Sequence, residues 1–196
     1  MMRKREEFEI SFETTEEKIK KGPWSKVYEW IDSPVYAVLL ILIIFTFFVR
    51  IVGVNGESMM PTLQNGDWLT VSAVTTEVER GDIVVVTQPN TLNEPLIKRV
   101  IAKGGDTINI DFLTGTVTVN GEVQNEPYIA ELTVRKGDFK GETVIPEGYL
   151  FVMGDNRNDS LDSRFDVVGL IDERYVLGIA QIRIFPFGDW NINDYE

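Results

Sequence analysis

The apolar residues of this chain fall into one long run followed by many short ones. Residues 34–54 read PVYAVLLILIIFTFFVRIVGV and carry no charge before Arg50. About twenty residues at a helical rise of ~1.5 Å match a hydrocarbon core of ~30 Å. The run therefore predicts one transmembrane helix over residues 33–54, with the long side chain of Arg50 reaching the interface. A cleavable signal peptide and a buried core helix are the alternatives, but a long segment precedes the run and no A-x-A site follows it.

Basic residues lie mainly on the N-terminal side of this run. After Arg50 the next basic residue is Arg80, whereas four lysines shortly precede the run: Lys18, Lys20, Lys21 and Lys26. Because such residues favour the cytoplasmic side of a membrane, we expect residues 1–32 in the cytoplasm and residues 55–196 outside it. The pattern predicts a single-pass protein of the cytoplasmic membrane with one extracytoplasmic domain.

Beyond residue 66 the pattern becomes one of short β-type runs between turn residues. Runs rich in Val, Ile and Thr predict strands at 68–74, 82–88, 95–102, 107–111, 116–119, 149–154 and 178–187. Asn120-Gly121 is the strongest signal for a tight hairpin. Gly-Asp occurs six times, and we interpret most of these dipeptides as turns. The domain is therefore expected to be mostly β and barrel-type.

The composition narrows the chemistry that this domain can perform. The chain has 196 residues, with neither cysteine nor histidine. Disulfides, thiolate zinc sites, a cysteine nucleophile and a histidine base are therefore excluded, and a transition-metal site is not expected. A Ca²⁺ or Mg²⁺ site made of carboxylates alone stays open, but the Asp-x-Asn-x-Asp pattern at 155–159 lacks the glycine and glutamate of an EF-hand loop. We expect no metal and no cofactor.

The net charge of −12 lies entirely on the part of the chain beyond the apolar run. Residues 55–196 hold eleven Lys and Arg against twenty-three Asp and Glu, whereas residues 1–54 are balanced. A nucleic-acid backbone needs a basic face on its protein partner. We therefore expect no nucleic-acid partner.

A candidate nucleophile follows the apolar run in the stretch NGESMMPTL. Pro61 and Thr62 prevent a helix from running through Ser58, so this serine is expected in a turn or an extended loop. In the stretch LIKRVIA, strand alternation places Lys98 on an apolar face with Leu96 and Val100, and burial on such a face lowers the pKa of a lysine. Ser58 and a neutral Lys98 would form a nucleophile and its base. The structural alternatives are a loop serine at the membrane surface and a lysine extending from a sheet edge.

A third polar stretch, GDNRNDSLDSR at 154–164, follows a predicted strand. Its aspartates and arginines can pair with one another, and Ser160 is a neutral group that could hold an uncharged amine. An ordinary solvated loop is the alternative interpretation of this stretch.

Four stretches together resemble the conserved boxes of type I signal peptidases. In order after the single apolar run, they are SMMPT (58–62), RGDIVVV (80–86), IKRVIAKGGDTI (97–108) and GDNRNDSLDSR (154–164). The resemblance is to the bacterial, Gram-positive-like branch and covers about residues 50–190. One departure is AKGGD where the family has GLPGD, and we expect the turn to tolerate it because Gly105-Asp106 is kept.

The resemblance implies a membrane-anchored serine endopeptidase that removes signal peptides from exported preproteins after small residues at positions −1 and −3. It also implies an SH3-like β-barrel with a long β-ribbon, preceded by the one transmembrane helix. Ser58 matches the nucleophile and Lys98 the general base of a Ser–Lys dyad. The residues that match supporting or orienting positions are Ser160, Asp162, Arg164, Asp155 and Arg99. The residues that match positions at the substrate cleft are Met59 and Ile97, together with Gly56, where some relatives complete the oxyanion hole.

The expected organisation is a cytoplasmic segment at 1–32, an anchor at 33–54 and a catalytic β domain at 55–196. Its expected partners are signal-peptide-bearing preproteins and membrane lipid. The oligomeric state stays open, with a monomer as the working expectation. Two other functions are weighed: another Ser–Lys maturation protease, of the conjugation type, and an inactive membrane-tethered β domain that binds partners. The inactive domain would lack Ser58 or Lys98, and both are present.

Overall fold

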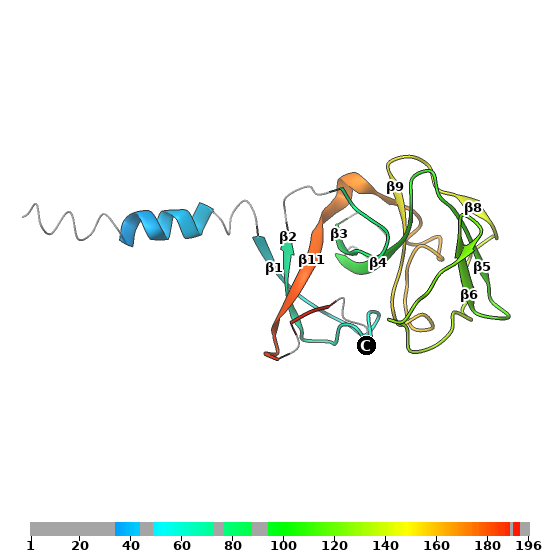
Figure 1. Cartoon of the computed structure of the whole chain (residues 1–196), viewed down its shortest axis with the longest axis horizontal. Coiled ribbons are helices and arrows are strands. Elements are labelled where there is room, and N and C mark those ends of the chain that lie inside the picture. Colours follow the sequence, from blue (N-terminus) through cyan, green and yellow to red (C-terminus); the bar gives the residue numbers. More distant parts are fainter. Residues whose placement is uncertain (1–33, 44–48, 73–76, 88–93, 189, 193–196) are drawn as a thin grey trace, which may run out of the picture. The chain divides into compact units, whose positions relative to one another are not determined.

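The computed structural model describes residues 34–43, 49–72, 77–87, 94–188 and 190–192 (Figure 1). The segment 1–32, which we expect in the cytoplasm, lies outside these residues. The strands of the described chain are β1 (Val49–Gly53), β2 (Trp68–Ser72), β3 (Ile83–Val86), β4 (Leu96–Lys103), β5 (Thr107–Asp111), β6 (Thr116–Val119), β7 (Glu122–Val123), β8 (Thr143–Val144), β9 (Tyr149–Met153), β10 (Ile171–Asp172) and β11 (Val176–Phe185). A short 3₁₀ helix, η1 (Glu173–Tyr175), precedes β11.

The apolar run is not one continuous helix. Residues 34–43 are helical, 44–48 lie outside the described residues, and Val49–Gly53 forms β1. Strand β1 pairs with β2 from Val49 opposite Ser72 to Gly53 opposite Trp68. The prediction of a helix reaching residue 54 is therefore wrong, because β-branched residues at the end of the run complete a sheet instead. Within the described ranges, no helix has both the length and the apolar character needed to cross a membrane.

Seven antiparallel strands form the larger sheet, in the order β1-β2-β11-β3-β4-β9-β10. Register shifts interrupt β11 and the pairing of β4 with β9, and such bulges increase strand twist. At one of them Gly178 passes so close to the Ser72 carbonyl oxygen that a Cβ atom would overlap it. Strands β1 and β4 are not neighbours in the sheet, yet both line one cleft, so the sheet curls into a half-barrel. The expected mostly β, barrel-type domain is confirmed in this form.

A second sheet has four strands in the order β7-β6-β5-β8 (Figure 1). Its strands β5 and β6 have the bounds predicted from the sequence. The predicted hairpin joins β6 to β7, and both turn residues have positive φ, 56° at Asn120 and 81° at Gly121. These angles are those of a type I′ turn, which matches the twist of the flanking strands.

Within the described residues, three buried hydrophobic clusters support the two sheets. One lies under the small sheet and includes Ile108, Val117 and Phe139. Another joins Val84, Val100 and Val152 across the middle of the large sheet. The third cluster includes Val54, Met59, Leu63, Leu69, Ile83, Ala180 and Ile192. Because Met59 and Leu63 follow Ser58 closely in the chain, this third cluster also fixes the turn that carries the candidate nucleophile.

Candidate active site

Ser58 lies at the start of a turn over residues 58–62, as predicted. The turn is held by a hydrogen bond from the Leu63 amide to the Met59 carbonyl oxygen at 2.9 Å. Both side chains are buried in the core, whereas Ser58 itself is half-buried. Burial of Met59 and Leu63 in the core thus holds the turn, with Ser58 at the wall of a cleft.

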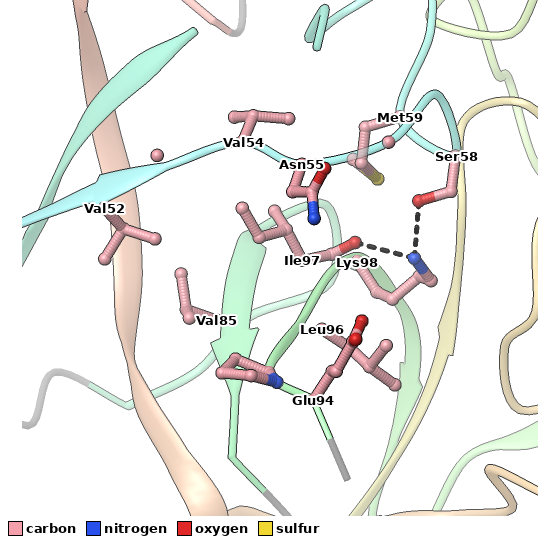
Figure 2. A pocket seen from close by; sticks show the side chains of 13 residues that line it. Val52, Val54, Asn55, Ser58, Met59, Val85, Glu94, Leu96, Ile97 and Lys98 are labelled. Atoms are coloured by element: carbon pink, nitrogen blue, oxygen red, sulfur yellow. Dashed lines mark hydrogen bonds between the residues drawn. The ribbon is translucent and has the colours of Figure 1, made fainter. Parts of the chain in front are cut away.

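Lys98 is the third residue of β4 and projects toward Ser58 (Figure 2). Its Nζ atom lies 2.7 Å from Ser58 Oγ and 2.9 Å from the carbonyl oxygen of Ile97. Only 3% of the lysine is exposed. Burial lowers the pKa of Lys98 to about 8, although the negative charges of Asp162 and Asp155 act in the opposite direction. At this pKa a neutral amine is populated in the mildly alkaline range, as a base requires.

The polar stretch 154–164 clamps the main chain beside Ser58. The Asn156 amide donates to the Ser58 carbonyl oxygen at 3.0 Å, and the Asn156 side chain donates to the Glu57 carbonyl oxygen at 3.1 Å. Gly154 lies so close that a Cβ atom would overlap both the Ser58 carbonyl oxygen and Ser160 Oγ. The stretch is therefore packed against the nucleophile turn and is not an ordinary solvated loop.

Asp155 and Arg99 form a buried, two-pronged ion pair. Arg99 Nε and Nη2 donate to the two carboxylate oxygens at 2.8 and 2.7 Å. Arg99 Nη1 also donates to the Gly81 carbonyl oxygen at 2.8 Å. Asp155 is fully buried, and it accepts a further hydrogen bond from Thr62. The pair thus joins β4, the turn before β3 and the nucleophile turn.

Asp162 and Arg164 form a second buried pair, two residues apart. Arg164 Nε and Nη2 each approach an oxygen of Asp162 at 2.8 Å. Arg164 also donates to the carbonyl oxygens of Arg135 and Arg157, and Asp162 accepts from the Gly154 amide at 3.0 Å. This pair therefore fixes the shape of the stretch on which Gly154 and Ser160 lie.

Ser160 makes no hydrogen bond to the lysine in this structure. Its side chain is 2% exposed, and its Oγ finds no hydrogen-bond partner within the part of the chain that the structure describes. Ser160 and Lys98 line the same groove. Buried hydroxyl groups are rarely left without a partner, so this one is available to a neighbouring donor.

A cleft of about 280 Å³ opens beside the two candidate catalytic groups (Figure 2). Gly56, Met59 and Ile97, the three residues predicted near the substrate, all line it. Its apolar wall continues into Val52, Val54 and Val85. A wider groove of about 570 Å³ shares Ser58 and Lys98 with the cleft and extends to Arg135, Asp159, Ser160 and Leu161. An extended chain lying over both would place one of its peptide bonds at Ser58.

Sequence reasoning missed a further set of polar residues behind the site. We expected Arg157 to pair within its own stretch, but it pairs with Glu126 at 2.6 Å, thirty-one residues earlier in the chain. Tyr128 lies over Arg99 and Arg157, and Thr133 accepts from Arg157 at 3.0 Å. No local pattern distinguishes these residues, because the fold alone brings residues 126–133 to the site.

Comparisons with known proteins match most of this chain to signal peptidases. The family model described as signal peptidase, peptidase S26, matches residues 27–185. Signal peptidase I of Bacillus licheniformis is 38% identical over 186 residues, which cover 89% of this chain and 97% of that protein. Signal peptidase IB of Staphylococcus aureus (strain COL) is 35% identical over 86% of this chain and 94% of its own. A solved signal peptidase I from Enterococcus faecalis V583 is 28% identical over 53% of this chain and 97% of its own, with a TM-score of 0.45.

The family match spans well over half of the chain, and the similar proteins from Bacillus and Staphylococcus are covered almost completely. The chain belongs to the signal peptidase family, peptidase S26, and is a hydrolase of peptide bonds.

Proposed function

We propose that this peptidase removes signal peptides from exported preproteins by a Ser–Lys mechanism, with Ser58 as the nucleophile and Lys98 as the general base. The observation that carries the proposal is the 2.7 Å separation of Lys98 Nζ from Ser58 Oγ at the wall of the cleft. A seryl hydroxyl is a weak nucleophile until a base within hydrogen-bond reach accepts its proton. Lys98 is the base that meets this requirement, because burial makes its neutral form accessible.

In the acylation step, Ser58 Oγ attacks the carbonyl carbon of the scissile bond while neutral Lys98 takes the hydroxyl proton. The tetrahedral intermediate collapses when the resulting ammonium gives that proton to the leaving amine of the mature protein. Water then attacks the acyl-enzyme, with Lys98 again as base, and Ser58 regains its proton as the signal peptide leaves. Each proton taken by Lys98 is returned, so the cycle needs no co-reactant other than water.

The developing oxyanion needs hydrogen-bond donors placed where the charge forms. The Ser58 amide makes no hydrogen bond within the described residues, so it is available as one donor. Gly56 precedes it in the same cleft wall, with a φ of 97° that favours glycine. The role assigned to Gly56 is to leave room for a substrate carbonyl to approach the Ser58 amide closely, because glycine has no side chain.

Ser160 is assigned to orient the lysine. A neutral amine has two N–H donors and one lone pair, and the lone pair must face the Ser58 hydroxyl. One N–H then donates to the Ile97 carbonyl oxygen, and the unpartnered Ser160 Oγ is the acceptor for the other. The buried pairs Asp162–Arg164 and Asp155–Arg99 are assigned to hold Ser160 and the nucleophile turn in place.

The cleft also supports a preference for small residues at −1 and −3. In an extended substrate, alternate side chains point to the same side, so these two residues would face the wall together. That wall holds Met59, Ile97 and Val85, and its bulky apolar side chains leave a cavity of about 280 Å³. Small apolar side chains suit such a shared space, whereas the residue at −2 would point away from the wall.

Membrane anchoring is part of the same proposal. The apolar segment that precedes β1 would hold the catalytic domain at the outer membrane face, with the N-terminal residues 1–32 in the cytoplasm. Ser58 then lies only a few residues beyond β1, at the height where a membrane-bound preprotein presents its cleavage site. Protease added outside spheroplasts should digest residues 55–196, and their protection would contradict this orientation.

The deciding experiment incubates the detergent-solubilised full chain with a purified preprotein and identifies the product by mass. Wild type should cut after small residues at −1 and −3, and Ser58→Ala should lose at least about a thousandfold in rate. Ser72→Ala, at the end of β2 and outside the cleft, is the matched control and should cut normally. Cleavage by Ser58→Ala at the wild-type rate would overturn the proposed nucleophile.

A further inference from the structure

We propose that Tyr128 is a positioning residue for the Ser–Lys reaction: its ring, in contact with the guanidinium groups of Arg99 and Arg157, holds Arg99 on Asp155 and so sets the charge that Lys98 experiences. The inference rests on the proposed function of Ser58 and Lys98. Tyr128 lies outside all four stretches that resemble the signal peptidase boxes, between β7 and β8.

The ring of Tyr128 contacts two buried cations. Arg99 Cζ lies 4.1 Å from the ring centroid and Arg157 Cζ lies 5.6 Å from it. A guanidinium over an aromatic ring is attracted by the negative face of the ring, most strongly where water is excluded. Arg99 and Arg157 are each 1% exposed, so both contacts meet that condition.

Arg157 supports the ring, because it is itself held by several hydrogen bonds. Its Nη1 and Nη2 atoms donate to the two carboxylate oxygens of Glu126 at 2.8 and 2.6 Å. Its Nε donates to the Gly154 carbonyl oxygen at 3.2 Å. The Tyr128 hydroxyl donates to Glu126 as well, at 3.2 Å. The ring is thus fixed to the stretch that clamps Ser58, and Arg99 rests against it.

Arg99 links the ring to the catalytic lysine through Asp155. The Asp155 carboxylate favours the ammonium form of Lys98, and the two-pronged pair with Arg99 offsets part of its charge. Without the ring, Arg99 becomes more mobile and more hydrated. It then offsets less of the negative charge of Asp155 that Lys98 experiences. Lys98 then releases its proton less readily, and less of the base is present at neutral pH.

Lys98 also experiences charged groups other than Asp155. Asp162 also favours the ammonium form, but its partner is Arg164. Glu94 lines the cleft with Lys98, and the charged residues that line the wider groove with it are Glu57, Glu94, Arg135 and Asp159. A change at Tyr128 should therefore act on Lys98 through Arg99 and Asp155.

The test measures kcat/KM against pH for the full chain with Tyr128→Leu and Tyr128→Phe. In the leucine variant the acid limb of the profile should move up by about one pH unit, which lowers kcat/KM about tenfold on that limb. The rate should return to near the wild-type value where Lys98 is neutral in both proteins. The phenylalanine variant keeps the ring over both cations, so its acid limb should coincide with that of the wild type.

Phe112→Leu is the matched control, because it removes a half-buried ring packed on the core of the small sheet. It should lower stability without moving the acid limb. An unshifted limb in Tyr128→Leu, or a rate lowered equally at every pH, would show that the ring has only a structural role. If the wild type does not cleave the preprotein, or Ser58→Ala cleaves it, the proposed function fails before this inference is tested.

Discussion

Thr62 donates its hydroxyl to the buried carboxylate of Asp155 at 2.5 Å, across ninety-three residues of sequence. This contact ties the far end of the nucleophile turn to the stretch that clamps its near end at the Ser58 carbonyl. Asp155 also holds Arg99, so a single carboxylate connects the turn, the clamp and the strand that carries Lys98.

Thr62→Val should weaken this connection while it preserves the shape of the side chain. The loss of a hydrogen bond to a charged acceptor should cost about 1–3 kcal/mol in the free energy of unfolding and lower the melting temperature. Cleavage should slow because the Ser58 main chain gains freedom. Thr118→Val is the control, since its hydroxyl donates to a main-chain carbonyl on the small sheet. Equal losses of stability and of cleavage rate in the two variants would show that the Thr62 hydrogen bond contributes no more than that of Thr118.

Asp162→Ala should cause one of the largest losses of stability in this domain. It leaves the Arg164 guanidinium buried without its carboxylate and removes the acceptor of the Gly154 amide. Loss of one partner of a buried ion pair costs about 3–5 kcal/mol. Asp166→Ala removes an exposed pairing with Lys140 and should change stability by about 0.5 kcal/mol or less. Chemical denaturation of the two variants provides the comparison, and equal midpoints would refute the buried-pair argument.

Gly154→Ala should lower activity because the added methyl group clashes with its neighbours, not because the backbone conformation requires glycine. Among the described residues, most glycines have positive φ, but Gly154 does not. Its Cβ would instead displace Ser160 Oγ or the Ser58 carbonyl oxygen. A misplacement of about 1 Å at a catalytic group can cost about a hundredfold in rate. Gly104→Ala is also crowded, with the Glu147 Cα atom 2.8 Å from the added Cβ, but it touches neither Ser58 nor Ser160. Both variants should be destabilised, and only Gly154→Ala should lose rate per folded molecule.

The strands were predictable where the local pattern alone decides the structure. The bounds of β5 and β6 agree with the prediction, because polar residues alternate with Ile in β5 and with Val in β6, and Asn120-Gly121 defines the following turn. The pattern predicts a helix where β1 lies, because the apolar residues of β1 continue the preceding run and its partner β2 follows only after the nucleophile turn. The two-residue strands β7, β8 and β10 are too short to carry a pattern.

At the site, sequence identified the candidate groups but not all of their partners. Alternation placed Lys98 on an apolar face, yet Arg99 on the opposite face is buried as well. That arginine is accommodated by Asp155 and Tyr128, which lie far away in the chain. Burial of a charge depends on such distant partners, so it follows from the topology and not from the periodicity of one strand.

The pH dependence of cleavage should follow the ionisation of Lys98. The reaction needs the neutral amine, and burial lowers the pKa of Lys98 to about 8. Below that pKa, kcat/KM should fall about tenfold for each pH unit, and above it the rate should level off. Lys98→Arg keeps the charge but cannot give up its proton, so it should be nearly inactive at every pH. A flat profile for the wild type, or cleavage by Lys98→Arg, would exclude Lys98 as the base.

Lys98→Met should stabilise the fold while it abolishes cleavage. The folded pKa of about 8 lies below the unfolded value of 10.5, so folding at neutral pH must overcome the burial of a charged amine. Between these values the unfolded chain binds more protons, and stability therefore rises with pH across this window. A buried thioether has no such cost, so the variant should gain about 2–3 kcal/mol near pH 7 and about 1 kcal/mol or less near pH 10. Lys140→Met, at an exposed position, should show no such trend. The free energy of unfolding is measured with denaturant at both pH values. If the wild type is more stable than Lys98→Met at pH 7, burial of the protonated Lys98 amine does not destabilise the fold.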